Sequence, residues 1–152
     1  MLIVKTIAAI LLVLWSIAAT AQARISIPDV TYKAHDRIDV EIENAGASDV
    51  TFCVEYGYSS SIDAEHAEPT PTPVYVQQKS SRGWDTLLTG PDIGSSPHPV
   101  TLGARESQHF PFRVNAHGTV RIVLEYRVGS DENFCFHRKG VRVARSREFS
   151  IE

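Results

Sequence analysis

The feature that most constrains the fold is an alternation of apolar and polar residues in short runs, separated by turns rich in Gly, Pro and Asn. In residues 37–44, RIDVEIEN, Ile38, Val40 and Ile42 share one face, and acidic residues between them share the other. A half-buried strand has this period of two, and no stretch after residue 24 sustains a helical period. We therefore predict an all-β, antiparallel two-sheet sandwich of about seven strands.

The same alternation assigns an inward face to the other expected strands. Residues 49–57, DVTFCVEYG, place Phe52 and Val54 inward and so turn Cys53 outward. Residues 89–99, TGPDIGSSPHP, are expected to cross to the other sheet after Trp84. Further strands are expected in 73–80, 84–88, 107–115, 119–128 and 140–152, and long loops in 59–73 and 129–139.

A resemblance covers about residues 25 to 152. The chain contains, in order, DRIDVEIENAGASDVTFCVEYG, VYVQQKSSRGWDTLL, VTLGARESQHFPFRV, GTVRIVLEYRV and SREFSIE. This succession resembles the small exported immunoglobulin-like domains of bacteria, and it is similar to the bacterial Ig-like domains related to intracellular proteinase inhibitors. The resemblance implies an immunoglobulin-like sandwich. It carries over no functional residue.

The first 23 residues have the pattern of a signal peptide. Lys5 provides the positive region, residues 7–19 form an apolar run, and 21–23, AQA, has small residues where a signal peptidase cuts. We predict cleavage between Ala23 and Arg24, leaving one domain over 24–152 that is periplasmic or secreted and not stably inserted in a membrane. The alternative is an uncleaved anchor over residues 2–21, which is nearly long enough to span a bilayer.

The two cysteines, Cys53 and Cys135, are predicted to form a disulfide, as an even count in an exported chain indicates. Cys53 lies on the solvent face of its strand, and Cys135 lies in the long loop after 119–128. In a sandwich of the resembled kind these two strands are neighbours, so the bond is expected to fasten the loop to the outside of a sheet. The alternative is two free or metal-bound thiols.

Charge is unevenly distributed along the chain. Residues 24–69 carry ten acidic and three basic residues, whereas 113–152 carry eight basic and five acidic residues. Neither half has the density of a nucleic-acid-binding arm, so no nucleic-acid partner is expected.

Three arginines near the C-terminus, Arg142, Arg145 and Arg147, are candidate partner contacts. Arg145 and Arg147 are in phase with the apolar Val143 and Phe149, which requires a bulge, a bend or an edge position. The simpler interpretation is an edge strand whose charges block aggregation, and the functional one is a contact for an acidic partner or polymer. Trp84 follows a hairpin turn and is expected to cap the edge of the sandwich, with ligand contact as the alternative.

Catalytic and metal-binding patterns are weak. The chain has no G-x-S-x-G, no H-E-x-x-H and no phosphate-binding glycine loop, so we predict neither an enzyme nor a cofactor. His35 and Asp36 are expected to be turn residues. No metal site is predicted, because Asp63, Glu65, His66 and Glu68 suit a solvated loop, and Cys135 with His137 lacks the further ligands of a copper site.

These observations favour an exported, non-catalytic Ig-like binding or accessory module that contacts another protein of the envelope or extracellular space. The first alternative is a protease-inhibitor-like module. The second is a metal-binding sandwich that uses His66 or His137, which a metal assay of the purified protein would distinguish.

Overall fold

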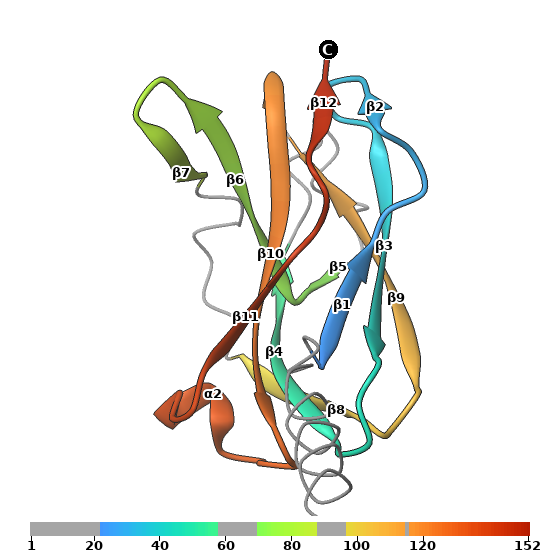
Figure 1. Ribbon diagram of the computed structural model, residues 1–152, viewed down its shortest axis with the longest axis vertical. Coiled ribbons are helices and arrows are strands. Elements are labelled where there is room, and N and C mark those ends of the chain that lie inside the picture. The colour runs from blue at the N-terminus through green and yellow to red at the C-terminus, as the bar shows by residue number, and fades with distance from the viewer. Residues whose placement is uncertain (1–21, 58–69, 88–96, 115) are drawn as a thin grey trace, which may run out of the picture.

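The computed structural model describes residues 22–57, 70–87, 97–114 and 116–152 (Figure 1). The smaller of its two sheets has the order β1-β3-β9, all antiparallel. Its strands are β1 (Ala23–Ser26), β3 (Arg37–Asn44) and β9 (Ser107–Arg113).

The larger sheet is built around the long strand β10 (Gly118–Val128). One edge of β10 pairs with β11 and β12, and the other with β4 and β6. The remaining strands extend this sheet: β2 pairs with β12, β5 and β8 pair with β4, and β7 pairs with β6. The bounds are β2 (Thr31–Tyr32), β4 (Val50–Gly57), β5 (Thr70–Thr72), β6 (Val74–Ser80), β7 (Gly83–Leu87), β8 (His98–Leu102), β11 (Arg142–Arg145) and β12 (Phe149–Ile151).

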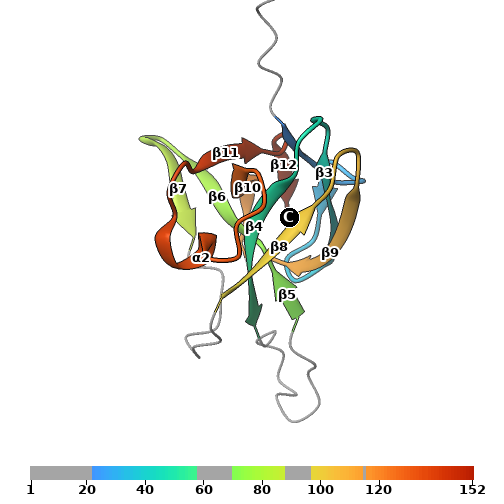
Figure 2. The same cartoon turned by 90° about the horizontal axis from the view of Figure 1, so that it is seen from below.

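The predicted all-β sandwich is confirmed, and its strand distribution is immunoglobulin-like. Strands β1 and β3 lie in one sheet, and β4, β10 and β12 lie in the other. The immunoglobulin fold has the same division, with its strands A and B in one sheet and C, F and G in the other. Figure 2 shows the two layers, with β3 and β9 on one side and β6, β7 and the short helix α2 (Phe134–His137) on the other.

The strand details differ from the prediction. Twelve strands are described instead of about seven, because short strands flank the long ones and the last predicted strand is divided into β11 and β12. One pairing, β2 with β12, is parallel. The predicted loop 59–73 contains β5, and the predicted loop 129–139 contains α2.

The chain also crosses between the sheets later than expected. Strand β8 pairs with β4, so residues 98–102 still belong to the larger sheet. The crossing occurs in the turn between Leu102 and Ser107, where Glu106 accepts a hydrogen bond through Oε2 from Gly103 N at 2.7 Å.

The core lies between the sheets and follows the predicted alternation. Ile38, Val40 and Ile42 of β3 are at most 1% exposed. Phe52 of the larger sheet meets Phe110 of the smaller sheet edge to face, with ring centroids 5.8 Å apart. Such an aromatic pair is stabilising beyond the area that it buries, so it joins the two layers at their centre.

A β-bulge explains why β11 and β12 separate. Arg145 stands opposite Val123 and Phe149 opposite Val120, so the three residues 146–148 face only two on β10. Ser146 fills the bulge: its Oγ accepts a hydrogen bond from Ile122 N at 2.9 Å, and its N–H donates to Ile122 O. The extra residue shifts the alternation and confirms the irregularity that the arginine phase predicted.

Residues 1–21 of the predicted leader, which was expected to cover 1–23, lie outside the described residues, whereas its last two residues, Gln22 and Ala23, belong to the fold. Within the described ranges, no helix has the length and apolar character needed to span a membrane.

Candidate binding surface

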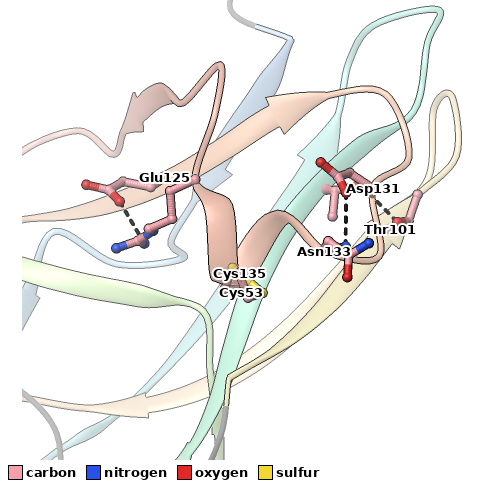
Figure 3. The surroundings of a disulfide bond; sticks show 8 residues. Cys53, Thr101, Glu125, Asp131, Asn133 and Cys135 are labelled. Atoms are coloured by element: carbon pink, nitrogen blue, oxygen red, sulfur yellow. Dashed lines mark hydrogen bonds and ion pairs between the residues drawn. A yellow bond between two sulfur atoms is a disulfide. The ribbon is translucent and has the colours of Figure 1, made fainter.

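The first element of the surface is a disulfide on the outer face of the larger sheet, meaning the face turned away from the smaller sheet. Cys53 on β4 bonds to Cys135 on α2 across 82 residues of sequence, with a Cα–Cα distance of 5.5 Å (Figure 3). The predicted pairing and its position outside the core are confirmed. Both cysteines are used, so the alternative of free thiols is wrong.

A small second core holds α2 on this face. Val123 of β10 and Phe134 of α2 are each 0% exposed, yet neither belongs to the core cluster between the sheets. Val123 lies on the same side of β10 as Arg121 and Glu125, as alternation requires. Phe134 is therefore buried outside the sandwich core, on a helix that lies against β4 and β8.

Polar contacts fix the segment that carries α2. Arg127 forms an ion pair with Asp131, whose Oδ1 accepts a hydrogen bond from Asn133 N at 2.9 Å (Figure 3). At the end of α2, Arg138 Nη2 lies 2.8 Å from Glu125 Oε2. The segment is thus attached to the sheet by a covalent bond, an apolar contact and two ion pairs.

Arg121 is held in one orientation on the outer face of β10. Its Nε donates a hydrogen bond to Gln77 Oε1 at 2.9 Å, and its Cζ lies 4.0 Å from the centroid of the Trp84 ring. A guanidinium stacked on an aromatic ring keeps its terminal nitrogens available as donors. Among the described residues, no carboxylate lies within ion-pair distance of Arg121.

Tyr75 and Arg145 flank Val123 on its two sides. Val123 pairs with Tyr75 of β6 on one edge of β10 and with Arg145 of β11 on the other. Burial raises the pKa of Tyr75 above its usual value near 10, and the charge of Glu125 adds to that rise. Three arginines lower the same pKa, namely Arg145, Arg138 and Arg121, so their positive charges act together near one phenol.

Apolar side chains are also exposed on the outer face of the larger sheet and on the helix fastened to it. Phe136 of α2 is 68% exposed, and Val143 of β11, which pairs with Glu125, is 38% exposed. An exposed aromatic ring beside arginine is typical of protein interfaces. We use the name outer patch for five residues: Tyr75, Arg121, Phe136, Val143 and Arg145.

The structure separates the four candidate contacts expected from the sequence. Arg145 lies in the outer patch, and Trp84 supports Arg121 instead of standing alone at the edge. Arg142 pairs with the core residue Tyr126 and therefore projects from the opposite face of β11. Arg147 donates from Nη2 to the backbone oxygens of Ile27 at 2.9 Å and Pro28 at 3.0 Å, so its role is structural.

Four residues of the outer patch were not predicted as contacts. Tyr75 and Arg121 alternate with core residues on β6 and β10, so the sequence places them outward but gives no sign that they lie on adjacent strands. Val143 was named only for its phase with Arg145, and Phe136 follows Cys135 in what was expected to be a loop. The pairing of β6, β10 and β11 puts Tyr75, Arg121 and Val143 on one face, and the disulfide fastens the helix that carries Phe136 to that face.

His35 and Asp36, which were considered for catalysis, have a structural role. His35 has φ of 70°, and Asp36 Oδ2 accepts a hydrogen bond from Lys33 N at 2.8 Å, so the pair forms a turn. Asp63, Glu65, His66 and Glu68 lie outside the described residues. Within the described part of the chain, no group of three or more His, Cys, Asp and Glu side chains is arranged to hold a metal ion.

Comparisons with known proteins give distant structural neighbours. No protein-family model and no curated protein sequence matches the chain. It is similar to the ASH/PapD-like domain (PapD-like domain 7) of human CEP192, at 13% identity and a TM-score of 0.33, over 90% of this chain and 89% of that one. It is also similar to Pseudomonas fluorescens alkylpurine DNA glycosylase AlkC bound to DNA with an abasic site analog, at 15% identity and a TM-score of 0.24, over 93% of this chain and 33% of that one.

Proposed function

We propose that this protein is an exported, non-catalytic immunoglobulin-like binding module that docks on another protein of the envelope or extracellular space. The outer patch is the docking surface. The observation that carries the proposal is the exposure of Phe136, at 68%, on a helix that a disulfide fastens to the same outer face that carries Arg121 and Arg145.

Rigid presentation supports a binding role. Association costs less when the contacting groups are already ordered. Here Phe136 is next to a cysteine bonded to β4, and Arg121 is fixed by Gln77 and Trp84. A short helix that buries Phe134 could be stable with a polar residue at position 136, so an exposed aromatic ring there is better explained by a partner than by folding.

The composition of the outer patch favours binding over catalysis. Its five residues supply guanidinium donors, one phenol and two apolar side chains, but no nucleophile paired with a base. Export is supported by the N-terminal sequence pattern, and the disulfide is compatible with an oxidising compartment.

The test is capture of partners with two matched variants. Phe136→Ser removes the exposed ring of the outer patch, and Val30→Ser removes another exposed apolar residue, 55% exposed, elsewhere on the surface. Tagged proteins are incubated with an envelope extract of the source cells, and captured proteins are quantified by mass spectrometry. We expect one or more proteins to be captured by the wild type and Val30→Ser and lost with Phe136→Ser, at unchanged melting temperatures.

Equal capture by all three proteins would show that the outer patch is not the docking surface. Failure of the wild type to capture any protein above the level of an unrelated sandwich domain would overturn the proposed function.

A further inference from the structure

We propose that Arg121, Arg145 and the hydroxyl of Tyr75 form a carboxylate-binding subsite for an acidic, extended segment of the partner protein. This inference rests on the proposed function and specifies the chemistry of the partner. Its three groups come from β10, β11 and β6, which are adjacent strands of one sheet.

Arg121 is prepared to bind a carboxylate. Its Nε is satisfied by Gln77, and the flat side of its guanidinium stacks near Trp84. In the part of the chain that the structure describes, its two terminal nitrogens have no hydrogen-bond acceptor. These two nitrogens have the spacing that a carboxylate accepts in a bidentate pair.

The cations of the surrounding face are incompletely neutralised. Lys79 has a carboxylate partner at 3.2 Å, Glu148, and Arg138 has one at 2.8 Å, Glu125. Arg121 and Arg145 have none among the described residues. The two uncompensated charges lie on the same face, so the complementary partner carries carboxylates there.

The spacing of the arginines fits an extended peptide. Arg145 stands beside Val123, which is two residues beyond Arg121 on β10. Residues two apart on a strand are separated by about 6.8 Å, and so are alternate side chains of an extended ligand. Arg145 is on the neighbouring strand, so the two arginines are also offset by about 4.8 Å across the sheet. An extended segment that crosses β10 obliquely, with an acidic residue at every second position, can therefore place one carboxylate near each arginine.

Trp84 makes a polysaccharide the less favoured occupant. A bound sugar commonly needs an open aromatic face for stacking, but two cations already approach this ring. Arg121 Cζ is 4.0 Å and Lys79 Nζ is 5.6 Å from its centroid. The ring therefore serves to position Arg121, as its cation–π geometry indicates.

The experiment uses the full chain with Trp15→Phe, which leaves Trp84 as the only tryptophan whether or not the leader is removed. Its fluorescence is followed while a peptide of alternating Glu and Ser is added. The control peptide has the same composition with its Glu residues in one block. The variants are Arg121→Gln, Arg145→Gln and, as a matched control on the opposite face of β11, Arg142→Gln. Because Trp84 contacts Arg121, binding of the variants is also measured by calorimetry.

We expect saturable binding of the alternating peptide that weakens roughly tenfold or more in Arg121→Gln and in Arg145→Gln, because each change removes a charge-assisted contact. Arg142→Gln should bind as the wild type does, and the block peptide should bind more weakly. Equal binding of both peptides, or equal losses in all three variants, would show diffuse charge attraction and overturn the subsite.

Three further measurements identify other occupants. Tighter binding of heparin, tighter binding of vesicles of anionic phospholipid, or self-association lost in Arg121→Gln would each overturn the acidic-segment proposal. No binding of any probe would overturn it as well. If Phe136→Ser abolishes partner capture while Arg121→Gln and Arg145→Gln do not, the proposed function stands and only the carboxylate subsite fails.

Discussion

Cys53 and Cys135 are bonded on the outside of the larger sheet, with the core on the opposite face of the strand that carries Cys53. In antibody domains the corresponding covalent link joins the two sheets through the core. Here Phe52 and Val54, on either side of Cys53, fill the core instead, at no more than 1% exposure. The covalent bond therefore organises the outer patch, and the sandwich is held by apolar packing.

The double variant Cys53→Ser with Cys135→Ser should fold and be less stable. Loss of a cross-link that closes a loop of 82 residues lowers the free energy of unfolding by about 2–4 kcal/mol, since chain entropy favours the unfolded state. Denaturant unfolding measures this loss. Reduced wild-type protein is the control and should have the same midpoint. A double variant without cooperative unfolding would contradict an outer-face role for the bond.

Truncation of Phe134 should lower the free energy of unfolding, whereas truncation of Phe136 should leave it almost unchanged. Phe134→Ala removes a ring that is 0% exposed beneath α2, and it should cost about 3 kcal/mol of unfolding free energy. Phe136→Ala removes a ring that is 68% exposed, and its effect should stay within about 0.5 kcal/mol. The comparison separates the structural side of α2 from its binding side. Similar costs for the two variants would show that α2 is packed differently.

Period-two alternation predicted the fold class because burial is decided locally on each strand. Ile38, Val40 and Ile42 face the core as expected, and the outward phase of Cys53 was sufficient to place its disulfide. The phase of Arg145 and Phe149 indicated the irregularity at Ser146. Residues four positions apart share one face of a regular strand, whereas Arg145 faces outward and Phe149 faces the core.

The site was less predictable, because it depends on lateral pairing. Arg121 and Tyr75 are 46 positions apart and meet only when β6 pairs with β10. Arg142 and Arg145 are three positions apart, so alternation put them on opposite faces of their strand, but only the pairing with β10 shows that Arg145 is the one on the outer face. The short helix α2 has no sustained period, and it is stabilised by Phe134 and the disulfide instead of by helix propensity.

Asn44 should be intolerant of even an isosteric change. Its side chain is 0% exposed, and Nδ2 donates to the backbone oxygens of Ser48 at 2.9 Å, Leu102 at 3.1 Å and Gly103 at 2.9 Å. Asn44→Ala should cost about 2 kcal/mol, because these buried carbonyls lose their donor. Asn44→Asp should cost about 3 kcal/mol or more at neutral pH, since a carboxylate would face three carbonyl oxygens.

Acidification distinguishes the two Asn44 variants. The unfavourable surroundings should raise the pKa of the new carboxyl in the folded state. Its destabilisation is then smallest at low pH, where the group is protonated in both states, and grows as pH rises through the unfolded pKa. Unfolding midpoints measured across pH should show this trend for Asn44→Asp relative to Asn44→Ala. Parallel pH profiles would contradict it.

Tyr75 should titrate above the ordinary value near 10, because burial and Glu125 disfavour the phenolate. The resulting stabilisation is fully present below the unfolded pKa and is lost as pH rises through the folded pKa. Glu125→Gln should lower the pKa of Tyr75, and Arg145→Gln should raise it. Phenolate absorbance, taken as the difference from Tyr75→Phe in each background, measures both shifts. Shifts of the same sign would contradict this arrangement of charges.

The processed chain should begin at Gln22. Ala23 is 1% exposed and pairs with Asn44, and Gln22 O accepts a hydrogen bond from Ala45 N at 2.7 Å. Cleavage after Ala23 stays a prediction from the sequence, but it would remove both residues from the fold. Residues 19–21, ATA, offer small residues at the same two positions for a cut after Ala21.

A substitution at Gly46 tests independently whether the folded chain keeps Gln22. A Cβ added at Gly46 would lie 2.3 Å from Gln22 Cγ, so the Gln22 side chain would have to move and lose its hydrogen bond to Ser48 O. Gly46→Ala should therefore destabilise a chain that keeps Gln22 by about 1 kcal/mol. The same substitution should have little effect on a chain that begins at Arg24, where that contact is missing. Intact mass identifies the processed end, and denaturant unfolding of the variant in both chain lengths measures the contact. Suppose that the processed protein has the mass of a chain that starts at Arg24, and that Gly46→Ala is as stable as the wild type. Gln22 would then lie outside the native domain.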